Sequence, residues 1–145
     1  MELWIDADGC PVTELAIHLA RKYHVACTLV CDTAHQMDYP GVKIITVSKG
    51  ADSADFALVN RVGRGDLVIT QDYGLAAMCL SRGAVPIHQD GFLYTNENID
   101  AMLFFRAASR KLRSSGGRMK GPKKRTREQN DAFSAALTHL LEAHS

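Results

Sequence analysis

Short apolar runs alternate with segments of helical periodicity along this 145-residue chain, and no other feature restricts its fold as much. The run at residues 25–31 carries no charged side chain, as expected of a parallel strand that is covered on both faces. Alternation of this kind is typical of βαβ units, whose strands lie parallel. Strands are expected at residues 2–6, 25–31, 42–47, 67–70 and 84–87, with an edge strand at 92–95.

Helical patterns fill the intervals between these runs. They predict helices at residues 12–23, 52–62, 75–82, 96–113 and 127–143. The last helix has the clearest start, because Thr126 and Gln129 have the spacing of a capping box. Its expected apolar face is Leu137, Leu140 and Leu141, while Phe56, Val59 and Val62 form the expected stripe of helix 52–62. The sequence therefore predicts an α/β domain with a mostly parallel sheet of four to five strands, flanked by helices, and a C-terminal helical extension.

Composition sets the class of protein. The chain is 46% hydrophobic and 23% charged, which is ordinary for a soluble globular domain, and its length suits one domain with a real core. No apolar stretch approaches the roughly 18 residues of a membrane helix, and no export signal is seen, so we expect a cytoplasmic protein. The four cysteines form no CxxC pair and are expected to be reduced, and Cys10 alone is a candidate for a ligand or catalytic role.

Aspartates follow the expected strand ends. Asp6 and Asp8 close the first strand, Asp72 follows the strand at 67–70, and Asp52 and Asp55 open the helix at 52–62. In an open parallel sheet, ligands bind at the carboxyl ends of the strands. Carboxylates gathered there repel one another unless a cation neutralises them, and hard oxygen ligands suit Mg²⁺ or Mn²⁺. We therefore expect these five aspartates to form a metal site, with Asp6 and Asp72 as the catalytic pair.

Ordinary structural roles for the same residues stay open. Asp8 and Gly9 have the composition of a turn, after which Asp6 would cap the following helix. Asp72 has the position of an N-cap, and Asp52 and Asp55 would interact favourably with a helix dipole. His88 follows an expected strand and is a weaker candidate for the same edge of the sheet.

Positive charge is concentrated in one segment. Residues 106–127 hold ten of the 17 Lys and Arg residues and no acid, whereas residues 1–105 hold seven basic against 13 acidic residues, a balance of −6. Backbone N–H groups at the start of the last helix favour anions. We expect this segment to bind a nucleic-acid backbone through Arg118, Lys120, Lys123, Lys124 and Arg125. A solvated linker without a partner is the alternative.

Four ordered motifs, at residues 6–11, 49–55, 70–76 and 117–126, resemble the YaiI/YqxD family of uncharacterised bacterial proteins, which is grouped with PIN-like nuclease domains. The resemblance implies one Rossmann-like, PIN-like domain over residues 1–145 that includes a basic loop at 114–125, with an acidic Mg²⁺ or Mn²⁺ site. In that site Asp6 would be the first-strand acid and Asp72 the acid after the fourth strand. Asp52 or Asp55 would be the acid of the central helix, and Asp8 or Asp90 a fourth ligand.

Three functions are compatible with these observations. The first is a metal-dependent nuclease that acts on RNA rather than DNA. The second is a non-catalytic RNA- or ribosome-binding protein on the same scaffold. The third rests on Ile5-Asp6-Ala7-Asp8, which resembles the start of haloacid-dehalogenase-type phosphatases, with Thr46 or Ser48 and Lys49 as later motifs; the spacing of Asp66 and Asp72 disagrees with that class.

Overall fold

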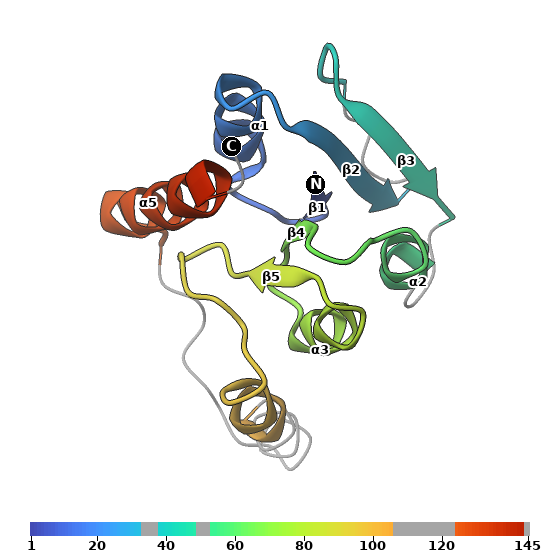
Figure 1. Ribbon diagram of the computed structural model, residues 1–145, viewed down its shortest axis with the longest axis vertical. Helices are drawn as coiled ribbons and strands as arrows, with labels where there is room; N and C mark the ends of the chain where they lie inside the picture. The colour runs from blue at the N-terminus through green and yellow to red at the C-terminus, as the bar shows by residue number, and fades with distance from the viewer. Residues whose placement is uncertain (33–37, 49–52, 106–123, 144–145) are drawn as a thin grey trace.

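Five strands form one parallel sheet in the order β3-β2-β1-β4-β5 (Figure 1). The computed structural model describes residues 1–32, 38–48, 53–105 and 124–143. Every neighbouring pair of named strands is parallel, so the expected α/β architecture is confirmed. The strands are β1 (Glu2–Asp6), β2 (Ala26–Asp32), β3 (Lys43–Val47), β4 (Leu67–Ile69) and β5 (Val85–Ile87).

The strand order reverses direction at β1. From β1 the chain moves outward through α1 (Thr13–Lys22) to β2 and β3, and α2 (Ser53–Val59) then returns it to β4 on the other side of β1. Leu3, at the centre of the sheet, is paired with Cys27 of β2 and with Leu67 of β4. In open parallel sheets ligands bind at the carboxyl ends of the two strands that flank such a reversal, here β1 and β4.

Helices cover both faces of the sheet (Figure 1). On one face α1 and α5 (Arg127–Ala143) pack together over a core that includes Leu3, Ile5 and Ile17. On the other face α2 and α3 (Tyr73–Ser81) cover Trp4, Val30 and Val68. This double coverage explains why the strand sequences are almost continuously apolar.

Helix α5 has the bounds that the sequence predicts. Gln129 Oε1 accepts a hydrogen bond from the Thr126 N–H at 2.8 Å, and the Gln129 N–H donates to Thr126 Oγ1 at 3.3 Å, which is the expected capping box. Its buried face consists of Phe133, Leu137 and Leu141, while Leu140 is partly buried. The helix therefore belongs to the core of the sheet rather than standing apart as an extension.

The expected apolar stripe of α2 is correct at two of its three residues. Val62 is buried and Val59 packs beside it, whereas Phe56 is 58% exposed. The buried position that the stripe omits is Leu58, with Ala54 packed beside it. Spacing by four from Ala54 gives the face that meets the sheet. The helix also ends at Val59, earlier than expected, because the Arg61 N–H bonds the Leu58 carbonyl and tightens the last turn.

The expected edge strand at 92–95 is also wrong. In the described part of the chain only an isolated antiparallel bridge joins Ile87 to Leu93. Pro86, on β5, has no N–H, and its carbonyl accepts from the Tyr94 N–H at 3.1 Å. A ladder on this side of β5 therefore lacks a donor at its centre.

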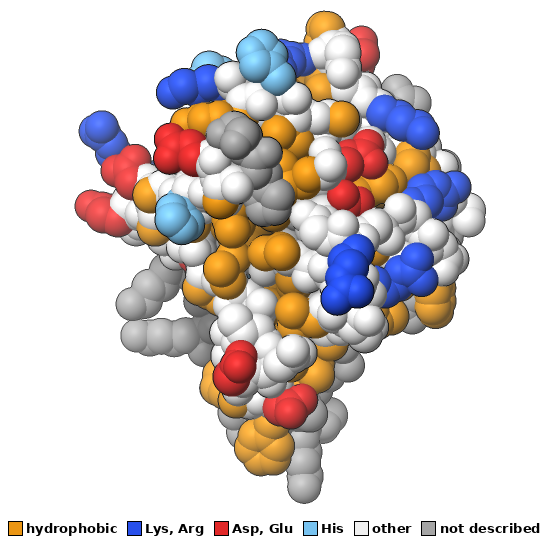
Figure 2. Space-filling model, viewed as in Figure 1, with side chains coloured by type: hydrophobic (Ala, Val, Ile, Leu, Met, Phe, Trp, Pro, Cys, Tyr) orange, Lys and Arg blue, Asp and Glu red, His pale blue; other side chains and the backbone are white. Residues whose placement is uncertain are grey.

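The following helix is capped by a different residue from the expected Asn96. Thr95 and Asn98 bond reciprocally, with the Thr95 N–H donating to Asn98 Oδ1 and the Asn98 N–H donating to Thr95 Oγ1. Residues 99–105 are helical, and the expected end at 113 lies outside the described residues. Phe104 and Phe105 are 76% and 62% exposed, and Figure 2 shows hydrophobic side chains over this helix at the bottom of the view.

None of the four cysteines forms a disulfide. All four cysteines are free thiols, with Cys31 and Cys79 buried and Cys10 and Cys27 half-buried. Cys31 and Cys79 are therefore the small core residues that the sequence predicts. Among the described residues no helix is both long enough and apolar enough to cross a membrane.

Gly91 gives a test of how α5 is seated. Its φ is +95°, and a Cβ added there would lie 2.6 Å from the Ala132 carbonyl oxygen of α5. We expect Gly91→Ala to lower the free energy of unfolding by roughly 2–4 kcal/mol in urea titrations.

Gly41→Ala is the matched control, because φ is +77° there but nothing lies within 4 Å of the added Cβ. It should cost only about 1 kcal/mol, which is the backbone strain alone. Equal losses in the two variants would show that the contact between Gly91 and α5 contributes nothing.

Candidate functional site

Thr70 joins the residues at the edge of the sheet where β1 and β4 end. Its hydroxyl donates to Asp6 Oδ2 at 2.9 Å and accepts from the Asp72 N–H at 3.0 Å. The side chain of Thr70 is buried, directly after β4, and Asp6 ends β1. The expected meeting of these two strand ends at one edge of the sheet is therefore confirmed.

The surroundings of Asp6 disfavour the ionised form of its side chain. Burial raises its pKa to about 6, and this effect exceeds the opposing hydrogen bond from Thr70. The negative charges of Asp72 and Asp8 raise the pKa further. Asp8 and Asp72 therefore both lie within electrostatic reach of Asp6, as the positions of these residues predict.

Asp72 has the structural role that was left open for it. It is the N-cap of α3, and its Oδ1 accepts from the N–H groups of Gly74 at 2.8 Å and Leu75 at 3.3 Å. The same carboxylate acts on the pKa of Asp6. Capping the helix and belonging to the acidic cluster are therefore compatible roles.

Asp8 turns toward the neighbouring strand. Its two carboxylate oxygens accept from the Asp32 N–H at 3.1 and 3.4 Å, which joins the turn after β1 to the end of β2. Gly9 has a φ of +70°, so the expected turn is present. The alternative in which Asp6 caps the next helix is wrong, because the N-cap residue of α1 is Val12 and makes no side-chain cap bond.

The two other aspartates expected in the metal site are Asp55 and Asp52. Asp55 lies in the first turn of α2, and its charge, together with that of Asp6, raises the pKa of the buried Cys79 thiol after the larger effect of burial. Asp52 lies outside the described residues. Within the ranges that the structure describes, no group of three or more His, Cys, Asp or Glu side chains is arranged to hold a metal ion.

Tyr94 is a member of the site that the sequence did not reveal. Its buried hydroxyl donates to the Thr70 carbonyl at 3.1 Å. Burial raises its pKa strongly, and Tyr73, Asp72, Asp90 and Asp6 raise it further in that order. Tyr94 therefore stays protonated and keeps its hydrogen bond to the Thr70 carbonyl, next to the edge where the acids gather.

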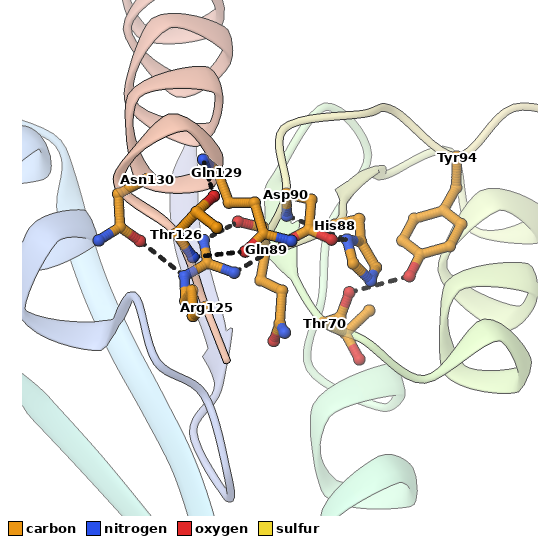
Figure 3. A network of polar contacts seen from close by, with 9 residues as sticks. All are labelled: Thr70, His88, Gln89, Asp90, Tyr94, Arg125, Thr126, Gln129 and Asn130. Carbon is orange, nitrogen blue, oxygen red and sulfur yellow. Dashed lines mark hydrogen bonds and ion pairs between the residues drawn. The ribbon is translucent and has the colours of Figure 1, made fainter. Parts of the chain in front are cut away.

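A second network joins the start of α5 to the loop after β5 (Figure 3). The Arg125 guanidinium donates to Asp90 Oδ1 at 2.7 Å, to the Gln89 carbonyl at 2.5 Å and to Asn130 Oδ1 at 2.6 Å. Arg125 thus holds α5 against this loop. Lys124 beside it is exposed, and the other expected nucleic-acid contacts, Arg118, Lys120 and Lys123, lie outside the described residues.

His88 lies between this network and Tyr94 (Figure 3). Its Nδ1 accepts from the Asp90 N–H at 3.0 Å, so a neutral ring carries its proton on Nε2. Burial lowers its pKa, which favours that neutral form, and Asp90 opposes the effect. The ring of His88 lies 6.1 Å from that of Tyr94, centroid to centroid, and the acid that acts on its pKa is Asp90 rather than Asp6 or Asp72.

The phosphatase alternative receives no geometric support. Thr46 lies on β3, which β2 separates from β1 and Asp6. Asp66 lies before β4, at the opposite end of the strands, and accepts from Trp4 Nε1 at 3.0 Å. These groups do not meet Asp6 as the later motifs of that class would.

The raised pKa of Asp6 predicts a dependence of stability on pH. The folded state holds this proton up to about pH 6, whereas the unfolded chain releases it near 3.8, so the wild type loses stability as pH rises between these values. Without divalent metal, we expect the stability of the wild type relative to Asp6→Asn to fall by about 2 kcal/mol from pH 4 to pH 7. Urea titrations at both pH values, with the exposed Asp38→Asn as control, measure this, and a constant difference would contradict it.

Arg125 and its neighbour Lys124 are expected to differ in their contribution to stability. Arg125→Ala removes three hydrogen bonds and leaves Asp90 without its cation, so it should lower the free energy of unfolding by roughly 1–3 kcal/mol. Lys124→Ala, at an exposed position, should change stability by less than about 0.5 kcal/mol. Thermal unfolding of the two variants decides the matter, and equal stabilities would refute the anchoring role of Arg125.

Comparison with known proteins identifies relatives of nearly full length. The chain is 52% identical over 141 residues to a UPF0178 protein of Exiguobacterium sibiricum, covering 97% of this chain and 96% of the relative. It is 48% identical over 145 residues to a UPF0178 protein of Clostridium acetobutylicum, covering 97% of each. No solved structure matches significantly. The profile described as uncharacterised BCR, YaiI/YqxD family matches residues 4–143, so the chain belongs to the YaiI/YqxD family of uncharacterised bacterial proteins.

Proposed function

We propose that this protein is a divalent-metal-dependent nuclease that hydrolyses phosphodiester bonds, in RNA rather than DNA. The observation that carries the proposal is the approach of Asp8 and Asp72 to Asp6 at the carboxyl ends of β1 and β4. Half-buried Asp6, with its pKa raised to about 6, holds a charge that the protein alone stabilises poorly. A cation at this edge of the sheet would relieve both the desolvation and the repulsion.

The donor set fits a sparse metal site rather than a protein cage. Mg²⁺ commonly keeps several waters and is held by one or two carboxylates together with substrate phosphates. Asp6 and Asp72 are the two carboxylates that we assign to this role, with Mn²⁺ as the alternative ion. Such an ion, when bound, would polarise the phosphodiester and supply an activated water.

The protein's own contribution is orientation. Thr70 holds Asp6 through its hydroxyl, and the first amides of α3 hold Asp72, so neither carboxylate has to be ordered when a ligand arrives. A carboxylate whose pKa lies near neutrality is also suited to accept a proton from water.

Substrate attraction is assigned to the basic segment. Lys124 is exposed beside the start of α5, and Arg118, Lys120 and Lys123 precede it in the sequence. Contacts between such side chains and phosphates raise affinity for any sequence and weaken with salt. The aspartates at the ends of β1 and β4 would otherwise repel a polyanion, so cleavage depends on the positive charge of the basic segment.

Cleavage of a mixed RNA pool in Mn²⁺ tests the proposal. Asp6→Asn and Asp72→Asn should each reduce the rate by 100-fold or more, on the order of the loss expected when a preorganised catalytic group is removed. Asparagine keeps an acceptor for Thr70 and for the α3 amides, so the fold should survive. The surface variant Asp38→Asn, purified identically, should cleave like the wild type. Equal rates in all four proteins would refute the assignment of the site.

One observation favours the non-catalytic alternative, an RNA- or ribosome-binding protein. Asp6 and Asp72 already accept hydrogen bonds from the protein, and the described residues present no three-donor metal group. Under that alternative, RNA affinity in EDTA would equal that in Mn²⁺. It would also be insensitive to Asp72→Asn, and no variant or wild-type protein would cleave.

A further inference from the structure

Phe92 presents an aromatic ring at the same edge of the sheet as the acids. It follows β5 in a turn that is closed by hydrogen bonds from the His88 N–H to the Phe92 carbonyl and from the Gly91 N–H to the His88 carbonyl, both at 2.9 Å. Its ring is stacked on His88, with centroids 4.3 Å apart and planes at 11°. The residue is nevertheless 37% exposed, so part of the ring remains open to solvent.

The Phe92 ring is held in place relative to Asp6, at the end of β1, by a chain of contacts. Tyr94 meets Phe92 edge-on, with centroids 5.3 Å apart, and the Tyr94 hydroxyl bonds the Thr70 carbonyl. Thr70 in turn bonds Asp6 through its hydroxyl. A chain of three side-chain contacts therefore connects Phe92 to the carboxylate at the end of β1.

The turn that carries Phe92 is held from behind as well. Gly91 lies against the backbone of α5 at Ala132 and Phe133, and Arg125 binds Asp90 and the Gln89 carbonyl (Figure 3). Asp90 also fixes His88 through its N–H. A ring supported in this way loses little conformational entropy when a flat ligand covers it.

We infer that the stacked pair of Phe92 and His88 is a platform on which an unpaired nucleobase of the substrate stacks. The inference rests on the proposed function and adds to it a site that positions a base. Every base has a π-face, so such stacking is indifferent to sequence. Paired bases lie stacked within a duplex and do not expose that face.

Binding measured without cleavage tests the inference separately from nuclease activity. In EDTA, fluorescence anisotropy of a short labelled oligouridylate should show that Phe92→Ala and Phe92→Leu bind roughly 5- to 100-fold more weakly than the wild type. Leucine keeps an apolar contact with His88 and removes only the aromatic face. Phe92→Trp should bind at least as well as the wild type, and its emission should fall when the oligonucleotide is added, since the other tryptophan, Trp4, is buried.

Two controls make the result specific. Phe56→Ala removes a more exposed phenylalanine, 58% against 37%, from α2, which packs against β1, β2 and β3, and should bind like the wild type. An oligonucleotide of abasic sugar phosphates should bind wild type and Phe92→Ala equally, because only the bases stack.

The outcomes are distinct. Loss of affinity in Phe92→Ala and Phe92→Leu for the base-containing strand alone supports the platform. Equal affinities for that strand, equal losses on the abasic strand, or no binding by the wild type overturn it. Cleavage that depends on Asp72 would leave the proposed function standing after such a failure, whereas stacking without cleavage would retain the platform and remove the nuclease.

Discussion

Thr70 joins the parts of this fold that matter for its site. The hydroxyl bonds Asp6 and the backbone of Asp72, the N–H bonds the Ile87 carbonyl, and the carbonyl accepts from Tyr94. These four hydrogen bonds connect the ends of β1, β4 and β5, the start of α3 and the segment that carries Tyr94. Because the residue is almost fully buried, a loss of its hydroxyl would leave Asp6 without its donor in a poorly solvated place.

Two carboxylates of the acidic cluster stabilise the fold and one destabilises it when ionised. Asp72 caps a helix and Asp8 joins β1 to β2, so both make ordinary structural hydrogen bonds. Asp6 differs, because its burial beside like charges disfavours ionisation. Groups that violate the local rules of stability tend to mark functional sites. Asp6 is therefore the residue around which the proposed chemistry is built.

Much of the fold follows from patterns within short windows of sequence. The apolar runs predict all five strands, and the spacing of Thr126 and Gln129 predicts the start of α5 to the residue. The exposed position of Phe56 shows the limit of this reasoning, since residues 56, 59 and 62 and residues 54, 58 and 62 both have helical spacing. Which of two apolar stripes meets the sheet is decided by packing and not by period.

The site was predictable where it depends on strand ends and unpredictable where it depends on distant partners. Asp6 and Asp72 could be placed because parallel strands end at one edge. The contacts of Arg125 with Asp90, and of Asp8 with Asp32, join residues 35 and 24 positions apart and leave no local trace. Tyr94 was hidden for the same reason, because its segment has the composition of an edge strand and its role comes from the Thr70 carbonyl.

Pro86 has a consequence for how the molecule behaves at high concentration. On the outer side of β5 it offers no N–H, and its carbonyl already accepts from Tyr94. A strand from another chain would thus find neither a donor nor a vacant acceptor at the centre of this border. The protein is in this way protected against edge-to-edge aggregation on the side of the sheet that carries Phe92, so an aromatic ring can stay exposed there without inviting the growth of the sheet into a fibre.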